Sequence, residues 1–322
     1  MLTTDLYPNV AALLTEVETL LKAKLLIKIN DDHKDGLDPE ASFTKPISAN
    51  TYEINVPKKE FINFCVAHEL LHLKQHGLNV VSSGLAFPLN QDNLSQVVSE
   101  VGDFTTTCVL HQIIIPDLKD LDVLTYEVQQ AILTRVLDVI PQEKPTDSAF
   151  LKLSRTLQIL DTFIFCEGFK TRNTTLHHTY PLAFDAAEKL LKAMHKNTID
   201  TNRKLRGTII KGLNAVTEFY QNMGIQLPAL NQTMTVSPVL SERQLNHQHL
   251  SQLFELWNPS ELISQQNTTY LVGIDKTDQQ SSFVIQNIDM SPENMKVLYQ
   301  LSPKDFFTKF NINYCLRDNS TL

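Results

Sequence analysis

The most constraining feature of this sequence is the HExxH motif HELLH at residues 68–72. The motif lies within segment 59–75, whose apolar residues predict a buried helix. Two histidines four positions apart share one face of a helix, so both imidazoles can reach one metal ion. Glu69 is offset around the helix and faces a water on that ion instead of the ion itself. The motif therefore predicts a zinc site with His68 and His72 as ligands and Glu69 as the catalytic general base.

A catalytic zinc site usually has a third protein ligand and keeps a fourth position open. The largely apolar segment 92–114 predicts a second helix, which ends before Pro116. Beyond its start, the acidic residues of this helix are Glu100 and Asp103, which share one face because they are three positions apart. One of them would bind the metal, and the other would hold a ligand histidine through its second ring nitrogen. His111, two turns beyond Asp103, is assigned at most a supporting role.

The HExxH helix and the acidic helix that follows it about 30 residues later, ending in the aliphatic run 113–115 and a proline, resemble the ImmA/IrrE family of zinc metallopeptidases. The resemblance covers roughly residues 5–140. It implies a gluzincin-like site, with HExxH on one helix and a carboxylate on the next. We prefer Glu100 as the third ligand, because glutamate has the longer reach and is the residue type that the family uses. Counting back from Pro116 favours Asp103 instead.

The resemblance also implies a function. The chain would be a cytoplasmic endopeptidase that cleaves one regulatory protein, such as a transcriptional repressor, by attack of a metal-activated water. In such sites a tyrosine or histidine outside the motif often stabilises the oxyanion of the transition state. The sequence does not indicate which residue does so among Tyr52, Tyr126, Tyr180 and the histidines. The alternative is a regulatory protein that binds a partner or DNA and has a structural or vestigial metal site. The presence of Glu69 argues against it, because a structural zinc site needs no general base.

The expected fold is helix-rich α+β. Segments 25–30 and 51–57 alternate as strands do, and the polar segment 30–46 between them predicts a loop. We expect a zincin-like metallopeptidase domain with a short antiparallel sheet over residues 1–146, followed by a helical region over 147–226 and an α+β module over 227–322. The linker is the polar, proline-containing stretch 141–148, and segments 269–276 and 281–289 predict a hairpin in the last module.

Composition excludes several classes of protein. The net charge of −8 disfavours a protein that binds nucleic acid mainly through contacts with phosphate groups. The basic stretch 201–212 nevertheless allows a contact with DNA. No apolar run approaches the ~20 residues of a membrane span, and the first ten residues have no signal-peptide character. The four widely spaced cysteines form no CxxC pair, which favours reduced, buried thiols in a cytoplasmic protein. No nucleotide-binding fingerprint is present.

Overall fold

The computed structural model describes residues 6–30, 36–90, 93–166, 174–194, 198–263 and 268–317. These residues form an α+β fold in which helices predominate. The chain divides into two compact units, one made of residues 1–80 and 110–189 and the other of residues 81–109 and 190–322. This division does not follow the three consecutive regions expected from the sequence, because each unit is assembled from two separate stretches of chain. The boundary at residues 109 and 110 falls inside helix α3 (Leu94–Asp120).

Helix α3 begins in the second unit, and the elements that begin in the first unit are α1 (Pro8–Leu21), β1 (Lys24–Ile29), the 3₁₀ turn η2 (Pro39–Ala41), β2 (Phe43–Ser48), β3 (Thr51–Val56), the 3₁₀ turn η3 (Lys59–Phe61), α2 (Ile62–Gly77), α4 (Tyr126–Val139), α5 (Ala149–Phe165), α6 (Thr174–Thr179) and α7 (Pro181–Met194). Those of the second unit are β4 (Ser83–Leu85), α8 (Asn202–Asn222), α9 (Leu230–Thr233), β5 (Met234–Val236), β6 (Val239–Leu240), α10 (Glu242–His247), α11 (Leu250–Leu253), β7 (Phe254–Trp257), β8 (Tyr270–Asp275), β9 (Ser281–Gln286), α12 (Pro292–Gln300), α13 (Pro303–Phe310) and β10 (Cys315–Leu316).

The first unit contains a three-stranded sheet in the order β1-β3-β2. Strands β1 and β3 confirm the two predicted strands, but they pair in parallel, and only β2 is antiparallel to β3. The sheet is therefore mixed, and the expectation of an antiparallel sheet is wrong. The loop predicted over 30–46 is also wrong in its last part, because β2 begins at Phe43. Pro46 masks this strand in the sequence, yet an edge strand tolerates proline.

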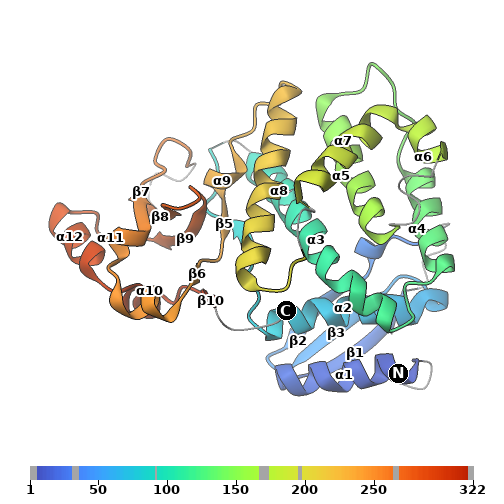
Figure 1. The fold of residues 1–322 in the computed structure, drawn as a ribbon, viewed down its shortest axis with the longest axis horizontal. Coiled ribbons are helices and arrows are strands. Elements are labelled where there is room, and N and C mark those ends of the chain that lie inside the picture. Colours follow the sequence, from blue (N-terminus) through green and yellow to red (C-terminus); the bar gives the residue numbers. More distant parts are fainter. Residues whose placement is uncertain are drawn as a thin grey trace. The chain divides into compact units, whose positions relative to one another are not determined.

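Helices α1 and α2 contact each other beside this sheet (Figure 1). Helix α2 confirms the predicted HExxH helix, and the core of the unit closes around its apolar residues, including Phe64 and Leu70. Helix α3 does not end before Pro116 but continues to Asp120. One proline removes a single helical hydrogen bond, and the burial of Ile114, Ile115 and Leu118 on the same helix favours its continuation.

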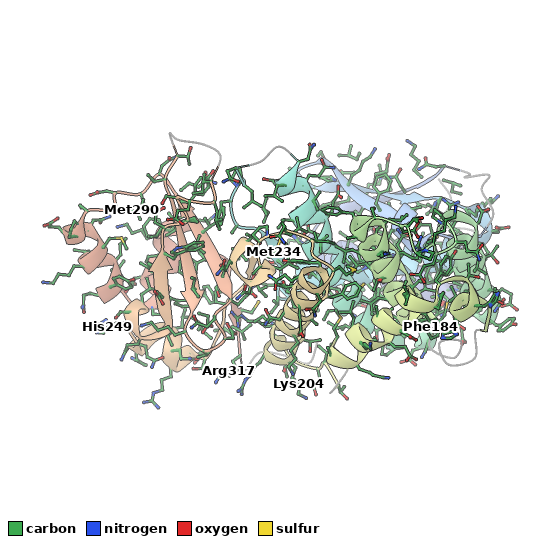
Figure 2. The ribbon with its side chains drawn as sticks, turned by 90° about the horizontal axis from the view of Figure 1, so that it is seen from above. Phe184, Lys204, Met234, His249, Met290 and Arg317 are labelled. Carbon is green, nitrogen blue, oxygen red and sulfur yellow. The ribbon has the colours of Figure 1, made fainter. Side chains whose placement is uncertain are left out.

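The stretch predicted as a linker, 141–148, is packed within the first unit. Arg155 of α5 is fully buried, and its guanidinium pairs with Asp147 at 2.9 Å and with Glu143 at 3.6 Å. The same helix packs against α7 through Phe163, whose ring lies 4.8 Å from that of Phe184 between centroids. Figure 2 labels Phe184 among the side chains of the molecule. Residues on both sides of the expected boundary at 146 and 147 are thus held together by buried contacts.

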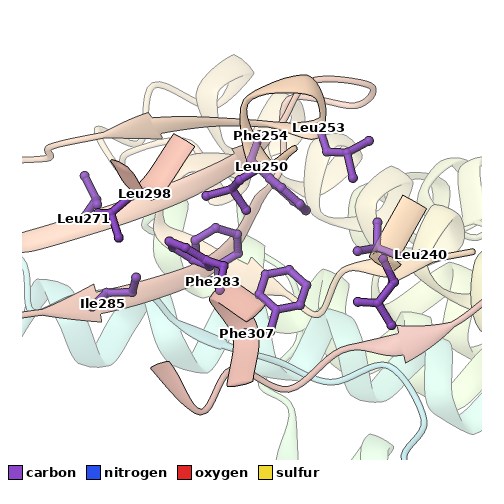
Figure 3. Close-up of a cluster of buried hydrophobic side chains, with 11 residues drawn as sticks. Leu240, Leu250, Leu253, Phe254, Leu271, Phe283, Ile285, Leu298 and Phe307 are labelled. Carbon is purple, nitrogen blue, oxygen red and sulfur yellow. The ribbon is translucent and has the colours of Figure 1, made fainter. Parts of the chain in front are cut away.

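The second unit contains the predicted hairpin. Strands β8 and β9 pair in antiparallel fashion, and β7 completes the sheet in the order β7-β8-β9. An apolar cluster that includes Phe254, Phe283 and Phe307 fills the space between this sheet and the helices near it (Figure 3). The basic stretch at the start of α8 is partly internal, since Arg206 is buried and pairs with Asp278.

Two further expectations concern the chain as a whole. All four cysteines are buried thiols that form no disulfide, as predicted. None of the helices in the described part of the chain combines the length and apolar character that crossing a bilayer requires.

Candidate metal centre

The centre is built on α2, a helix held by apolar residues on most of its surface. His68 and Glu69 are 2 % and 6 % exposed, and His72, one turn further on, is partly buried. Their positions at i and i+4 bring the two imidazoles to one side of the helix, where the Nε2 atoms are 3.3 Å apart. Burying three polar side chains among apolar ones is costly unless they have partners.

Helix α3 supplies a third imidazole. His111 is fully buried, and its Nε2 lies 3.0 Å from the Nε2 of His68. One ring nitrogen from each of His68, His72 and His111 falls within 4.8 Å of the other two. Two nitrogens that bind one tetrahedral zinc ion at about 2.0–2.1 Å are roughly 3.3–3.4 Å apart. The spacing of the three rings therefore fits a single metal ion.

The opposite nitrogens of two of the rings are occupied by carboxylates. His68 Nδ1 lies 3.1 Å from Glu69 Oε1, and His111 Nδ1 lies 2.6 Å from Asp161 Oδ1. Because an ionised carboxylate only accepts hydrogen bonds, each Nδ1 carries the ring proton and donates it. Burial, then the charge of His68, holds the pKa of His111 well below its usual value, so that ring is neutral. When His68 also loses its Nε2 proton, the Nε2 lone pairs of the two rings face one another, an arrangement that a cation stabilises.

Glu69 is held from two sides. Its Oε1 accepts from His68, and its Oε2 accepts from the hydroxyl of Thr44 on β2 at 2.9 Å. Burial disfavours the charged form of this carboxyl, but the hydrogen bonds from His68 and Thr44 and the nearby charge of His68 outweigh it and lower the pKa of Glu69. The carboxylate is therefore ionised beside the imidazole of His68 and can accept a proton.

A second carboxylate approaches from η2. Glu40 Oε1 lies 3.5 Å from His111 Nε2, and Glu40, His111 and Asp161 form a second group of donor atoms within 4.8 Å of one another. Burial, and then the charge of Asp161, raises the pKa of Glu40 to about 7. A negative group in this position is thus stabilised by any cation that binds among the imidazoles.

Aromatic side chains surround the imidazoles. Phe165 of α5 contacts His111 with 4.6 Å between ring centroids and contacts His68 at 5.8 Å. Phe64, one turn before His68, stacks on it at 5.9 Å. These rings restrict the orientation of the imidazoles and lower the local dielectric, which strengthens binding of a charged ion to its ligands.

The structure brings together His68, His72 and Glu69 but places the two acidic candidates elsewhere. Glu100 and Asp103 are exposed on α3, where Glu100 accepts from Gln96 and Asp103 accepts from Ser99. Neither belongs to a group of donor atoms that could hold a metal among the described residues. The third imidazole of the group that could hold a metal is that of His111, two turns further along the helix than Asp103, whereas neither carboxylate expected as the third ligand belongs to this group.

Three residues of the centre were not expected from the sequence: Glu40, Thr44 and Asp161. Asp161 lies beyond residue 146, outside the range assigned to the metal-binding region. The sequence does contain an indication of a role for Asp161, because it is the only acidic residue in the apolar helical segment 149–166. Among the tyrosines considered for oxyanion binding, Tyr180 is fully buried and donates its hydroxyl to the carbonyl of Ile140.

Replacing Asp161 by asparagine should weaken zinc binding by about 10–100-fold, because the carboxylate that fixes the ring of His111 is lost. Competition with a chromophoric chelator measures this affinity. Asp103→Asn is the matched control, since Asp103 is exposed and contacts only Ser99 among the polar groups described here. If the two variants bind zinc with equal affinity, Asp161 has no role in the metal centre.

No model of a known protein family, no curated protein and no solved structure matches this chain.

Proposed function

We propose that this protein is a zinc-dependent peptidase whose metal ligands are His68, His72 and His111. The observation that carries the proposal is the convergence of the imidazoles of His68, His72 and His111, with an ionised, buried glutamate hydrogen-bonded to the Nδ1 of His68. A structural zinc site has four protein ligands and needs no base. The adjacent Glu69 favours catalysis over the alternative of a regulatory protein with a structural site.

When bound, zinc supplies Lewis-acid chemistry, which polarises a carbonyl oxygen and makes water a stronger acid. Glu69 takes a proton from the attacking water on one carboxylate oxygen and passes it to the departing amine nitrogen. Thr44 holds the other oxygen, so the carboxylate keeps its orientation during this transfer. Asp161 keeps the proton of His111 on Nδ1 and so leaves Nε2 available.

The sheet offers a place for a peptide next to Glu69. Strand β2 lies at the edge of the sheet, and its side chains Phe43 and Ile47 are 47 % and 52 % exposed. An extended peptide can add to such an edge through main-chain hydrogen bonds. Because Thr44 of the same strand contacts Glu69, a peptide on β2 passes close to the base.

The resemblance to the ImmA/IrrE family and its zincin-like fold is part of this proposal. It rests on the HExxH helix, on the small α+β unit around it and on the helix that follows. A histidine on that helix supplies the donor for which a carboxylate was expected. In this proposal the substrate is a regulatory protein of the cytoplasm, cleaved at a limited number of bonds.

Wild-type protein should bind about one Zn²⁺ per chain, and cells that produce it should contain new protein termini. The control is His68→Ala, which removes a ligand and should abolish both results. The measurements are metal analysis of purified protein and a comparison of protein N-termini in the two cell populations. If the wild type contains zinc but the two sets of termini are identical, the enzyme proposal fails and the structural metal site is favoured.

A further inference from the structure

We propose that the outer face of the three-stranded sheet binds an acidic segment of a partner protein that also carries apolar side chains. Thr44 of β2 contacts Glu69 of α2, so its side chain points toward that helix. Successive residues of a strand point to opposite sides, so Phe43 and Lys45 lie on the other side of the sheet. With the residues that pair beside them on β3 and β1, they form the outer face, which carries Lys24, Leu26, Lys28, Phe43, Lys45 and Glu53.

Apolar side chains of the outer face are open to solvent. Leu26 and Phe43 are 38 % and 47 % exposed, whereas Leu25, on the inner side of β1, is buried. A single exposed apolar residue is ordinary, but two on one face of a small sheet indicate a surface that binds something. The occupant of this face therefore brings apolar side chains of its own.

The charges of the outer face are mainly positive. Lys28 and Lys45 lie on either side of Glu53, and their Nζ atoms are 4.0 Å and 3.0 Å from its Oε1. Lys24, at the start of β1, adds a third exposed ammonium group. Three lysines and one glutamate leave positive charge in excess, in a chain whose net charge is −8. Charge complementarity therefore selects a partner that presents carboxylates.

The same charges disfavour other occupants. A second copy of this chain related by a twofold axis would bring the lysines of one face against those of the other. A nucleic acid, with a charge on every phosphate, would be repelled by the acidic remainder of the chain. An acidic protein segment with apolar side chains is complementary to both components of the face.

Strand β2 connects the outer face with the candidate metal centre. Phe43 and Lys45 belong to this face, while Thr44 between them contacts Glu69. A partner held on the outer face is thus kept one strand away from the base. That this partner is the substrate rests on the proposed function, whereas the binding itself needs no metal.

The test measures binding of a short fluorescent peptide of alternating glutamate and leucine to the full-length chain. Two double variants change the outer face: Lys28→Gln with Lys45→Gln, and Leu26→Ser with Phe43→Ser. Each should bind the peptide about tenfold more weakly than the wild type, because it lacks two charges or two apolar contacts. Added salt should weaken binding to the wild type, and a peptide of alternating lysine and leucine should not bind.

The matched control is Lys304→Gln with Lys309→Gln, which removes two charges from exposed positions of α13 and should leave binding unchanged. The residues exchanged on the outer face are also exposed, so both variants should fold as the wild type does. Circular dichroism checks this expectation.

The outcomes separate this inference from the proposed function. A wild type that does not bind the peptide, or outer-face variants that bind it as tightly as the wild type, would overturn the docking surface. Tighter binding of the wild type to phosphatidylserine vesicles than to the peptide would assign the face to a lipid surface and also overturn it. His68→Ala should bind the peptide as the wild type does, so failure of the peptidase proposal leaves this measurement unaffected. Equal amounts of new protein termini from the wild type and from Lys28→Gln with Lys45→Gln would show that the partner is not the substrate.

Discussion

Replacing His111 by alanine should abolish tight zinc binding as completely as His68→Ala or His72→Ala. The ring of His111 is fully buried, its Nε2 is 3.0 Å from that of His68, and its Nδ1 is held by Asp161. Loss of a direct ligand should cost more than the 10–100-fold typical of an outer-shell partner. Zinc content after dialysis and chelator competition measure the effect.

The controls for this prediction are Glu100→Gln and Asp103→Asn. Both side chains are exposed on the same helix as His111, and both hydrogen-bond to a residue one turn earlier. Each variant should keep the zinc affinity of the wild type within about twofold, as expected of a surface substitution. Zinc lost in Glu100→Gln and retained in His111→Ala would restore the ligand set expected from the sequence and overturn the centre described above.

Local patterns predicted the parts of the fold that depend on residues near one another in the chain. The apolar spacing around His68 and His72 gave a helix, and the alternation in 269–289 gave a hairpin; both are present. Strand β2 could not be predicted in this way. The polar residues of this segment and Pro46 are typical of a loop. The strand forms because it pairs with β3, and the sequence of the segment alone does not indicate this pairing.

His111, the third imidazole of the candidate centre, was given at most a supporting role for a different reason. An acidic residue in an apolar helix is recognised in a sequence as a candidate ligand, because burying a carboxylate is costly. A histidine in the apolar run 108–115 is equally typical of a buried residue with a structural role. The carboxylate that holds Nδ1 of His111, and so favours this residue as a metal ligand, is that of Asp161, 50 positions away. Periodicity carries no information about such a pair, because it depends on how α5 packs within the unit. The same packing explains why the expected domain boundary at 146 and 147 lies inside a unit.

Replacing Glu69 by glutamine should separate metal binding from catalysis. The glutamine amide keeps the size of the side chain, and its oxygen can still accept from His68, but it cannot take a proton from water. Cleavage should therefore fall by about 10²–10⁴-fold, the usual contribution of a general base. Zinc affinity should fall less than about tenfold, because Glu69 contacts His68 on Nδ1, away from the nitrogen that faces the metal.

The measurement is the rate at which a substrate identified by the new termini is cleaved, together with the zinc content of the same sample. Glu100→Gln is the matched control, the same chemical change at an exposed site, and it should leave both values unchanged. Glu69→Gln that lost zinc as completely as His111→Ala would make Glu69 a ligand. The metal would then have four protein ligands, and no base would be free to take the proton from water. A structural role of the metal would then explain the site better than catalysis.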